Sequence, residues 1–155
     1  MLKYFNYDIV FQEIPDEVTL AINLSNCPNR CEGCHSPHLT EDVGEVLTKD
    51  VLADLLSKYG KAITCVCFMG GDAAPLEVVK LAEYILYKNC DIKVGWYSGR
   101  DELPIGFTSE PFTYIKLGPY IEQYGGLSCK TTNQRLYKIH DGQLFEDITC
   151  RFEKS

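Results

Sequence analysis

Short strand-like apolar runs alternate along the chain with longer stretches whose apolar residues recur at helical spacing. Residues 18–24 alternate and then become apolar, with β-branched side chains, which predicts a strand. Residues 48–60 place their apolar side chains on one helical face, with Thr48 as a candidate N-cap and Gly60 at the end, so we expect a helix there. The nearly continuous apolar run 62–68 is typical of a strand covered on both faces.

The second half of the chain continues this alternation. Pro75 suits the first turn of a second amphipathic helix, which extends to Asn89. We expect strands at 92–97 and 112–117, and a terminal hairpin whose two strands flank Asp141-Gly142. Such alternation favours right-handed βαβ units, whose functional loops gather at the carboxyl edge of the sheet.

The length of the chain limits how many such units it can hold. A complete eight-unit barrel takes about 250 residues, whereas this chain has 155. The predicted fold class is therefore α/β, an open, incomplete (β/α) barrel with a mostly parallel sheet and a C-terminal hairpin. Residues 1–155 should form one domain, because the composition does not shift along the chain and no linker-like stretch interrupts it.

Charge and hydropathy indicate which classes of partner and which cellular location to expect. The net charge is −7 and no run of Lys or Arg stands out, which argues against direct binding to nucleic acid. No apolar run approaches the roughly 18 residues that a membrane span needs, and the first residues lack a secretory signal. We therefore expect a cytoplasmic protein whose eight cysteines stay reduced or bind metal.

Three cysteines, Cys27, Cys31 and Cys34, lie close together in a segment rich in turn-forming residues. A structural zinc site needs four protein ligands, and an ordinary electron-transfer [4Fe–4S] cluster is held by four cysteines. A cluster bound by three leaves one iron open for a substrate or cofactor. The alternative is zinc, with His35 or His38 as the fourth ligand.

The other cysteines lack this spacing, and two of them lie in an apolar run. Free cysteine is among the most buried residue types, so we expect core packing or no special role for them. They are Cys65, Cys67, Cys90, Cys129 and Cys150.

The three-cysteine loop after a first strand, followed by Gly70-Gly71-Asp72 after a second, resembles the radical S-adenosylmethionine (SAM) superfamily. Within it, the chain resembles the family of activating proteins of anaerobic (class III) ribonucleotide reductases. The likeness covers most of the chain and is carried by the cysteine loop with His35, Phe68-Met69-Gly70-Gly71-Asp72, Trp96-Tyr97-Ser98-Gly99, Gly118-Pro119-Tyr120 and Thr132-Asn133-Gln134-Arg135.

Two features depart from this pattern. Asp72 stands where many superfamily members have Glu, although the activating family resembles this chain in accepting Asp. Residues 13–17 do not resemble the glycine-rich stretch that many glycyl-radical activators have before the cysteines. The second departure bears on which partner is activated and leaves the chemistry unchanged.

The resemblance implies that Cys27, Cys31 and Cys34 hold three irons of a [4Fe–4S] cluster, and that the fourth iron chelates the amino and carboxylate groups of SAM. One electron from the reduced cluster would cleave SAM into methionine and a 5′-deoxyadenosyl radical. That radical would abstract a hydrogen atom from a glycine of the partner, leaving a stored glycyl radical. No catalytic residue beyond the cofactor ligands is expected, because the cofactors carry the difficult step.

The resemblance also implies which residues contact SAM. Gly70 and Gly71 would let the backbone approach it closely, and Asp72 could accept hydrogen bonds from its ammonium group. A simple strand-to-helix turn is the alternative for this motif. Gly33 and His35 match the position that contacts adenine. Further candidates, each open to a structural role, are Ser98 and Lys116, followed by Arg100, Asn133 and Arg135.

Small size favours a protein substrate. A chain of this length has no residues for a lid, yet a radical must be shielded from water. A docked partner could enclose the site, with Tyr120 and Tyr124 as candidate contact residues. The implied partners are the glycyl-radical subunit of anaerobic ribonucleotide reductase and a flavodoxin- or ferredoxin-type reductant. The alternatives are activation of a formate-lyase type enzyme, radical chemistry on a small molecule, and a non-enzymatic iron–sulfur or zinc module.

Overall fold

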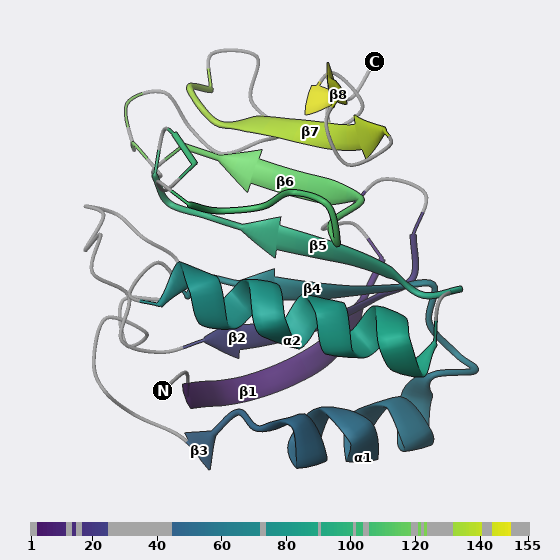
Figure 1. Cartoon of the computed structure of the whole chain (residues 1–155). Coiled ribbons are helices and arrows are strands. Elements are labelled where there is room, and N and C mark those ends of the chain that lie inside the picture. Colours follow the sequence, from purple (N-terminus) through teal and green to yellow (C-terminus); the bar gives the residue numbers. More distant parts are fainter. Residues whose placement is uncertain are drawn as a thin grey trace.

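A mixed β-sheet and two helices make up the part of the chain that the computed structural model describes. The described residues are 3–11, 14, 17–24, 45–71, 74–89, 91–100, 102–103, 106–118, 121, 123, 132–140 and 144–149. The helices are α1 (Lys49–Tyr59) and α2 (Pro75–Lys88). The strands are β1 (Lys3–Val10), β2 (Thr19–Leu24), β3 (Glu45–Val46), β4 (Cys65–Met69), β5 (Lys93–Tyr97), β6 (Tyr114–Leu117), β7 (Arg135–His140) and β8 (Leu144–Asp147). Figure 1 shows them in one sheet, in the order β3-β1-β2-β4-β5-β6-β7-β8.

The predicted fold class, an α/β open, incomplete (β/α) barrel with a mostly parallel sheet, is wrong. The pairs β2–β4, β4–β5 and β5–β6 are parallel. The pairs β1–β2, β1–β3, β6–β7 and β7–β8 are antiparallel. Only two helices occur in the described residues, so strands dominate. The architecture is a strand-rich mixed sheet instead of a barrel of the radical SAM type.

Connection length explains the difference. A parallel pair needs a crossover of a dozen or more residues, whereas antiparallel neighbours can be joined by a short turn. Residues 141–143 alone separate β7 from β8, and the two strands form the expected antiparallel hairpin. In the long crossover from β5 to β6, residues 98–113, the described part contains no helix. The βα alternation therefore ends after α2.

Local signals place both helices as expected. α1 follows Thr48, whose hydroxyl oxygen accepts a hydrogen bond of 3.2 Å from the Val51 backbone N–H, and Gly60 is its C-cap. α2 begins at Pro75. The strands β2, β4, β5 and β6 overlap the expected ranges. No helix among the described residues is long and apolar enough to cross a membrane.

The sequence pattern does not indicate β1 or β3. The register of β1 against β2 shifts between Tyr4 and Asn6, which breaks the alternation that identifies a strand. β3 has only two residues and pairs with Lys3 and Tyr4 of β1. β3 therefore depends on pairing with chain that is distant in sequence, whereas β1 pairs both with β3 and with β2, the next strand in the chain.

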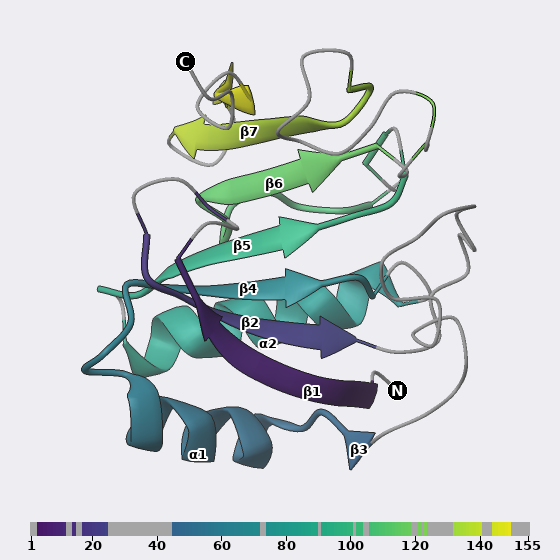
Figure 2. The same ribbon diagram turned by 180° about the vertical axis from the view of Figure 1, so that it is seen from behind.

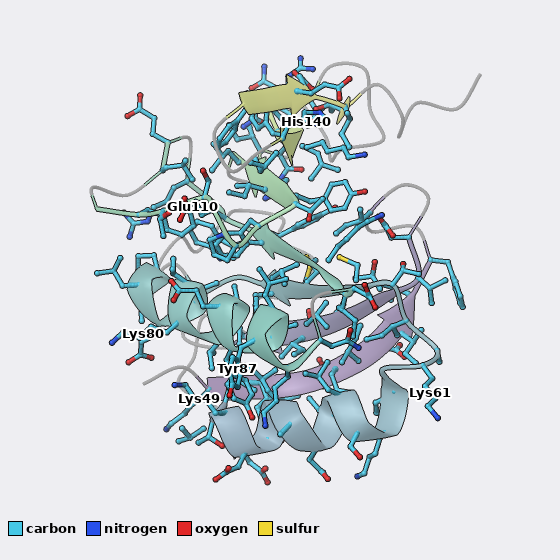
Figure 3. All side chains as sticks on the ribbon, turned by 45° about the vertical axis from the view of Figure 1, so that its right-hand side comes forward. Lys49, Lys61, Lys80, Tyr87, Glu110 and His140 are labelled. Carbon is cyan, nitrogen blue, oxygen red and sulfur yellow. The ribbon has the colours of Figure 1, made fainter. Side chains whose placement is uncertain are left out.

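The two helices cover one face of the sheet, as the views from opposite sides show (Figures 1 and 2). Side chains of the helices and of the central strands fill the space between these layers (Figure 3). This core includes Leu20, Ile22, Val66, Phe68, Val94, Trp96 and Ile115 from the sheet, and Leu52, Leu55, Val78, Ala82 and Ile85 from the helices. Burial of these apolar side chains fixes the helices to the sheet.

A smaller apolar cluster covers the opposite face of the sheet and includes Cys65 and Cys67. Both thiols are fully buried, which confirms core packing for these two cysteines. Burial raises the pKa of the Cys65 thiol well above its ordinary value, so the thiol stays protonated. Cys90, Cys129 and Cys150 lie outside the described residues.

Glu17 is a buried carboxylate at the amino-terminal edge of the parallel strands. It accepts hydrogen bonds from Lys93 Nζ at 2.8 Å, the Tyr114 hydroxyl at 2.6 Å and the Thr64 hydroxyl at 2.8 Å. Burial by itself would raise the pKa of Glu17, but these hydrogen bonds and the Lys93 charge lower it below its ordinary value. Glu17 therefore ties the segment before β2 to the beginnings of β4, β5 and β6.

The Glu17 network makes stability depend on pH. We expect Glu17→Gln to lower the free energy of unfolding at pH 7 by about 1–3 kcal/mol, because three donors, among them the buried Tyr114 hydroxyl, lose their carboxylate. The folded pKa lies below the unfolded value of about 4.3, so this stabilisation is present above that value and is lost as the pH falls through the folded pKa. Urea unfolding at pH 7 and at about pH 3.5 measures the change.

The expected result is a difference between wild type and Glu17→Gln that shrinks on acidification. Asp54→Asn is the matched control, because it removes an exposed ion pair with Lys58 and should change stability by less than about 0.5 kcal/mol. A difference that stays constant from pH 7 to pH 3.5 would contradict the assignment of the low pKa to Glu17.

Candidate functional site

The carboxyl ends of four neighbouring parallel strands meet at one edge of the sheet. Leu24 ends β2, Met69 ends β4, Tyr97 ends β5 and Leu117 ends β6. The arrowheads of β2, β4, β5 and β6 point to the same side in Figure 1. Because ligands of parallel sheets bind outside the carboxyl ends of the strands, this edge is the candidate site.

The three-cysteine motif begins directly after β2, but residues 25–44 lie outside the described residues. Five predicted site residues lie in this segment, namely Cys27, Cys31, Gly33, Cys34 and His35. Asp72 of the second motif and the candidate contact residues Tyr120 and Tyr124 also lie outside the described residues. The described chain reaches this segment at Leu24 and resumes at Glu45. Among the described residues, no three His, Cys, Asp or Glu side chains form a group that could hold a metal ion.

Gly70 and Gly71 form the turn that follows β4. Their φ angles are +102° and +91°, a conformation that favours glycine. The Gly70 N–H donates to the Tyr97 carbonyl at 2.9 Å, and the Ala74 N–H donates to the Gly71 carbonyl at 3.0 Å. A Cβ added to Gly70 would lie 3.5 Å from the Leu24 carbonyl oxygen. The structure thus brings the glycine turn against the residue from which the chain enters the cysteine segment.

A third hydrogen bond to this turn comes from Trp96, which is fully buried. Its indole Nε1–H donates to the Gly70 carbonyl oxygen at 2.6 Å. Sequence reasoning identifies Trp96 only as part of a motif and misses this contact. The general signal is that a buried tryptophan needs an acceptor for its N–H, but the sequence does not say which acceptor.

Ser98 and Lys116 lie together at the ends of β5 and β6. Lys116 is 8% exposed, and its Nζ donates to the carbonyl oxygens of Ser98 and Gly118, both at 2.9 Å. The ammonium group also lies 5.7 Å from the centre of the Tyr97 ring. The Ser98 hydroxyl oxygen accepts from the Arg100 backbone N–H at 3.1 Å. These contacts within the chain favour a structural role for Ser98 and Lys116 in holding the edge together.

Asn133 and Gln134 also lie at this edge, beside Gly118, which directly follows β6. A Cβ on Gly118 would lie 3.1 Å from the Gln134 Cα, and the φ of Gly118 is +111°, so glycine allows the close approach. The buried Gln134 side chain donates to the Gly118 carbonyl at 3.3 Å, a contact that sequence reasoning does not predict. Arg135 instead pairs with Asp147 across the β7–β8 hairpin, at 3.7 Å.

Lys116 should contribute to stability by bridging two strand ends. We expect Lys116→Met to lower the free energy of unfolding by about 1–3 kcal/mol, because buried carbonyl oxygens lose a charged donor. The neighbouring strand offers a control in Lys138→Met, which should stay within about 0.5 kcal/mol of wild type. Urea unfolding of both variants measures the difference, and equal effects would show that the two carbonyl bonds contribute nothing specific.

No protein-family model matches the chain, and no curated protein or solved structure matches it either. The assignment of a function therefore depends on the cysteine spacing and on the geometry of the carboxyl edge. The cysteine segment follows Leu24 in the sequence, and Gly70 at the carboxyl edge lies close to the Leu24 carbonyl oxygen.

Proposed function

We propose that this chain is a radical SAM activating enzyme that generates a glycyl radical on anaerobic ribonucleoside-triphosphate reductase. The observation that carries the proposal is that Gly70 lies close to Leu24, the last described residue before the three-cysteine segment, so that an added Cβ would touch the Leu24 carbonyl oxygen. It brings the second motif to the entry of the first, at the edge of the sheet where ligands of parallel strands bind. The protein would act in the cytoplasm, where its cysteines stay reduced.

The donor set fits the cofactors. Cys27, Cys31 and Cys34 would hold a [4Fe–4S] cluster with soft thiolate ligands and leave one iron open. Gly70 and Gly71 present backbone without side chains at the adjoining turn. The cluster and SAM, when bound, supply the one-electron chemistry that removes a hydrogen atom from a glycine. The chain's own residues bind and orient the two cofactors.

Each of the remaining candidates has a defined task in this proposal. Asp72 would accept hydrogen bonds from the SAM ammonium group, and Gly33 and His35 would contact its adenine. Lys116 and Ser98 would hold the ends of β5 and β6 in place beside the glycine turn, through the carbonyl contacts described above. The polypeptide thus supplies binding and orientation, as proteins do for cofactors that carry the reaction.

The position of the described hollow supports a protein as the substrate. A hollow of about 780 Å³ is lined by Glu83 and Leu86 of α2, residues 110–113 before β6, and Ile139. Glu110 marks this place near α2 in Figure 3. Phe112 and Thr113 directly precede β6, so the hollow includes the amino end of this strand, whereas the candidate site lies at the carboxyl ends. A docked reductase could enclose the site itself, with a flavodoxin or ferredoxin as the reductant.

An electron paramagnetic resonance experiment tests the proposal. The protein is reconstituted with iron and sulfide without oxygen, reduced, and mixed with SAM and the anaerobic ribonucleotide reductase of the same organism. We expect a glycyl-radical doublet that disappears in Cys27→Ala, Cys31→Ala and Cys34→Ala. Cys150→Ala, which changes a cysteine outside the motif, is the matched control and should retain the doublet.

Other results would contradict parts of the proposal. Release of 5′-deoxyadenosine without the doublet would keep the chemistry but exclude this partner, and adding a formate-lyase type enzyme would test the next one. Turnover of a small molecule without any partner would exclude a protein substrate. Neither signal from protein with a full cluster, or zinc bound in its place, would exclude the enzyme.

A further inference from the structure

The hydrogen bond between Trp96 and Gly70 is short, buried and held by packing. The Nε1–O distance is 2.6 Å, at the short end of the range for N–H···O bonds. The indole stacks on the Phe107 ring, with centroids 4.8 Å apart, and contacts Phe112 at 6.4 Å. Because Trp96 is fully buried among these rings, the direction of its N–H is fixed.

This bond orients one particular peptide group. The Gly70 N–H and the Gly71 carbonyl, on the peptides before and after it, bond to Tyr97 and Ala74. The peptide between Gly70 and Gly71 is held by Trp96 alone among the described residues. Two glycines in succession leave such a peptide free to rotate, since neither has a Cβ to restrict it. Trp96 therefore fixes the part of the turn that the backbone itself leaves undetermined.

The same bond determines where the Gly71 N–H points. A trans peptide is planar, with its N–H directed opposite to its carbonyl, and no described peptide is cis. The Gly70 carbonyl points at the indole, so the Gly71 N–H points away from it. Gly71 is buried, yet no described residue accepts a hydrogen bond from this N–H. Buried backbone N–H groups are nearly always paired, which indicates an acceptor that a ligand could supply.

We infer that Trp96 is a positioning residue for SAM: its indole turns the Gly70–Gly71 peptide so that the Gly71 N–H donates to the SAM carboxylate. The inference rests on the proposed function and adds a residue that does not itself contact the ligand. The carboxylate is the acceptor that matches a backbone N–H donor, because a hydrogen bond to an ionised acceptor is short and strong. The SAM ammonium group has only donors and cannot serve.

The test removes the indole N–H while keeping the ring. Trp96 is the only tryptophan in the chain, so incorporation of β-(3-benzothienyl)alanine in place of tryptophan changes this position alone and replaces the N–H by sulfur. Trp96→Phe provides a second variant without the donor. Phe145→Leu is the matched control, because it weakens the aromatic packing against Tyr137 in the β7–β8 hairpin and changes no ring that packs on Trp96.

Equilibrium dialysis of the cluster-loaded protein measures the dissociation constant for SAM and for decarboxylated SAM. We expect both Trp96 replacements to weaken SAM binding about tenfold or more, as for one lost bond to a charged group. For decarboxylated SAM, the dissociation constants of both Trp96 replacements should stay within about twofold of the wild-type value, because this ligand lacks the carboxylate that accepts the hydrogen bond. Phe145→Leu should lower the melting temperature without changing either constant.

Two outcomes would overturn the inference while leaving the proposed function in place. One is unchanged SAM affinity in the benzothienyl variant. The other is an equal loss of affinity for SAM and decarboxylated SAM, which would mean that Trp96 acts on the site as a whole. Failure of the wild-type, cluster-loaded protein to bind SAM would instead contradict the proposed function.

Discussion

The parallel register of four strands is the constraint on which the candidate site depends. Asn23 of β2 pairs with Met69 of β4, Met69 with Tyr97 of β5, and Tyr97 with Lys116 of β6. These four residues therefore form one row across the sheet, close to its carboxyl edge. Strands that run in the same direction must end at the same edge, so segments far apart in sequence are brought together there. The glycine turn lies close to Leu24, the last described residue before the cysteine segment, for this reason.

One buried charged side chain forms hydrogen bonds at each edge of the parallel strands β2, β4, β5 and β6. At the amino edge, the Glu17 carboxylate is surrounded by three donors. At the carboxyl edge, the Lys116 ammonium bonds two carbonyl oxygens and lies over the Tyr97 ring. A buried charge stabilises a fold only where its hydrogen-bonding capacity is met, and both groups meet this condition. Each joins strands that β-sheet hydrogen bonds already align.

The glycine turn depends on the core of the protein. Gly70 and Gly71 supply the backbone freedom that close contact with a ligand requires, but freedom alone gives no defined direction. Trp96 packs against Phe107 and Phe112, and its one hydrogen bond to the Gly70 carbonyl oxygen fixes the direction of the Gly70–Gly71 peptide. Packing in the core and the geometry of the candidate site are therefore linked through this bond.

The sequence by itself determined the features that depend on neighbouring residues. Thr48 and Pro75 mark the beginnings of α1 and α2, and apolar runs mark β2, β4, β5 and β6, because caps and periodicity act within a few residues. The cysteine spacing and the Gly70-Gly71 turn, from which the function is proposed, are local in the same sense.

Only the tertiary structure decided how β1, β3 and β7 pair within the sheet and which hydrogen bonds the candidate site contains. β3 forms through pairing with distant chain, and antiparallel neighbours on both sides make the sheet mixed instead of a barrel. The bonds of Trp96 to Gly70 and of Glu17 to Lys93 and Tyr114 join residues 26, 76 and 97 positions apart. No local pattern encodes such contacts, because they arise only when packing brings the two partners together.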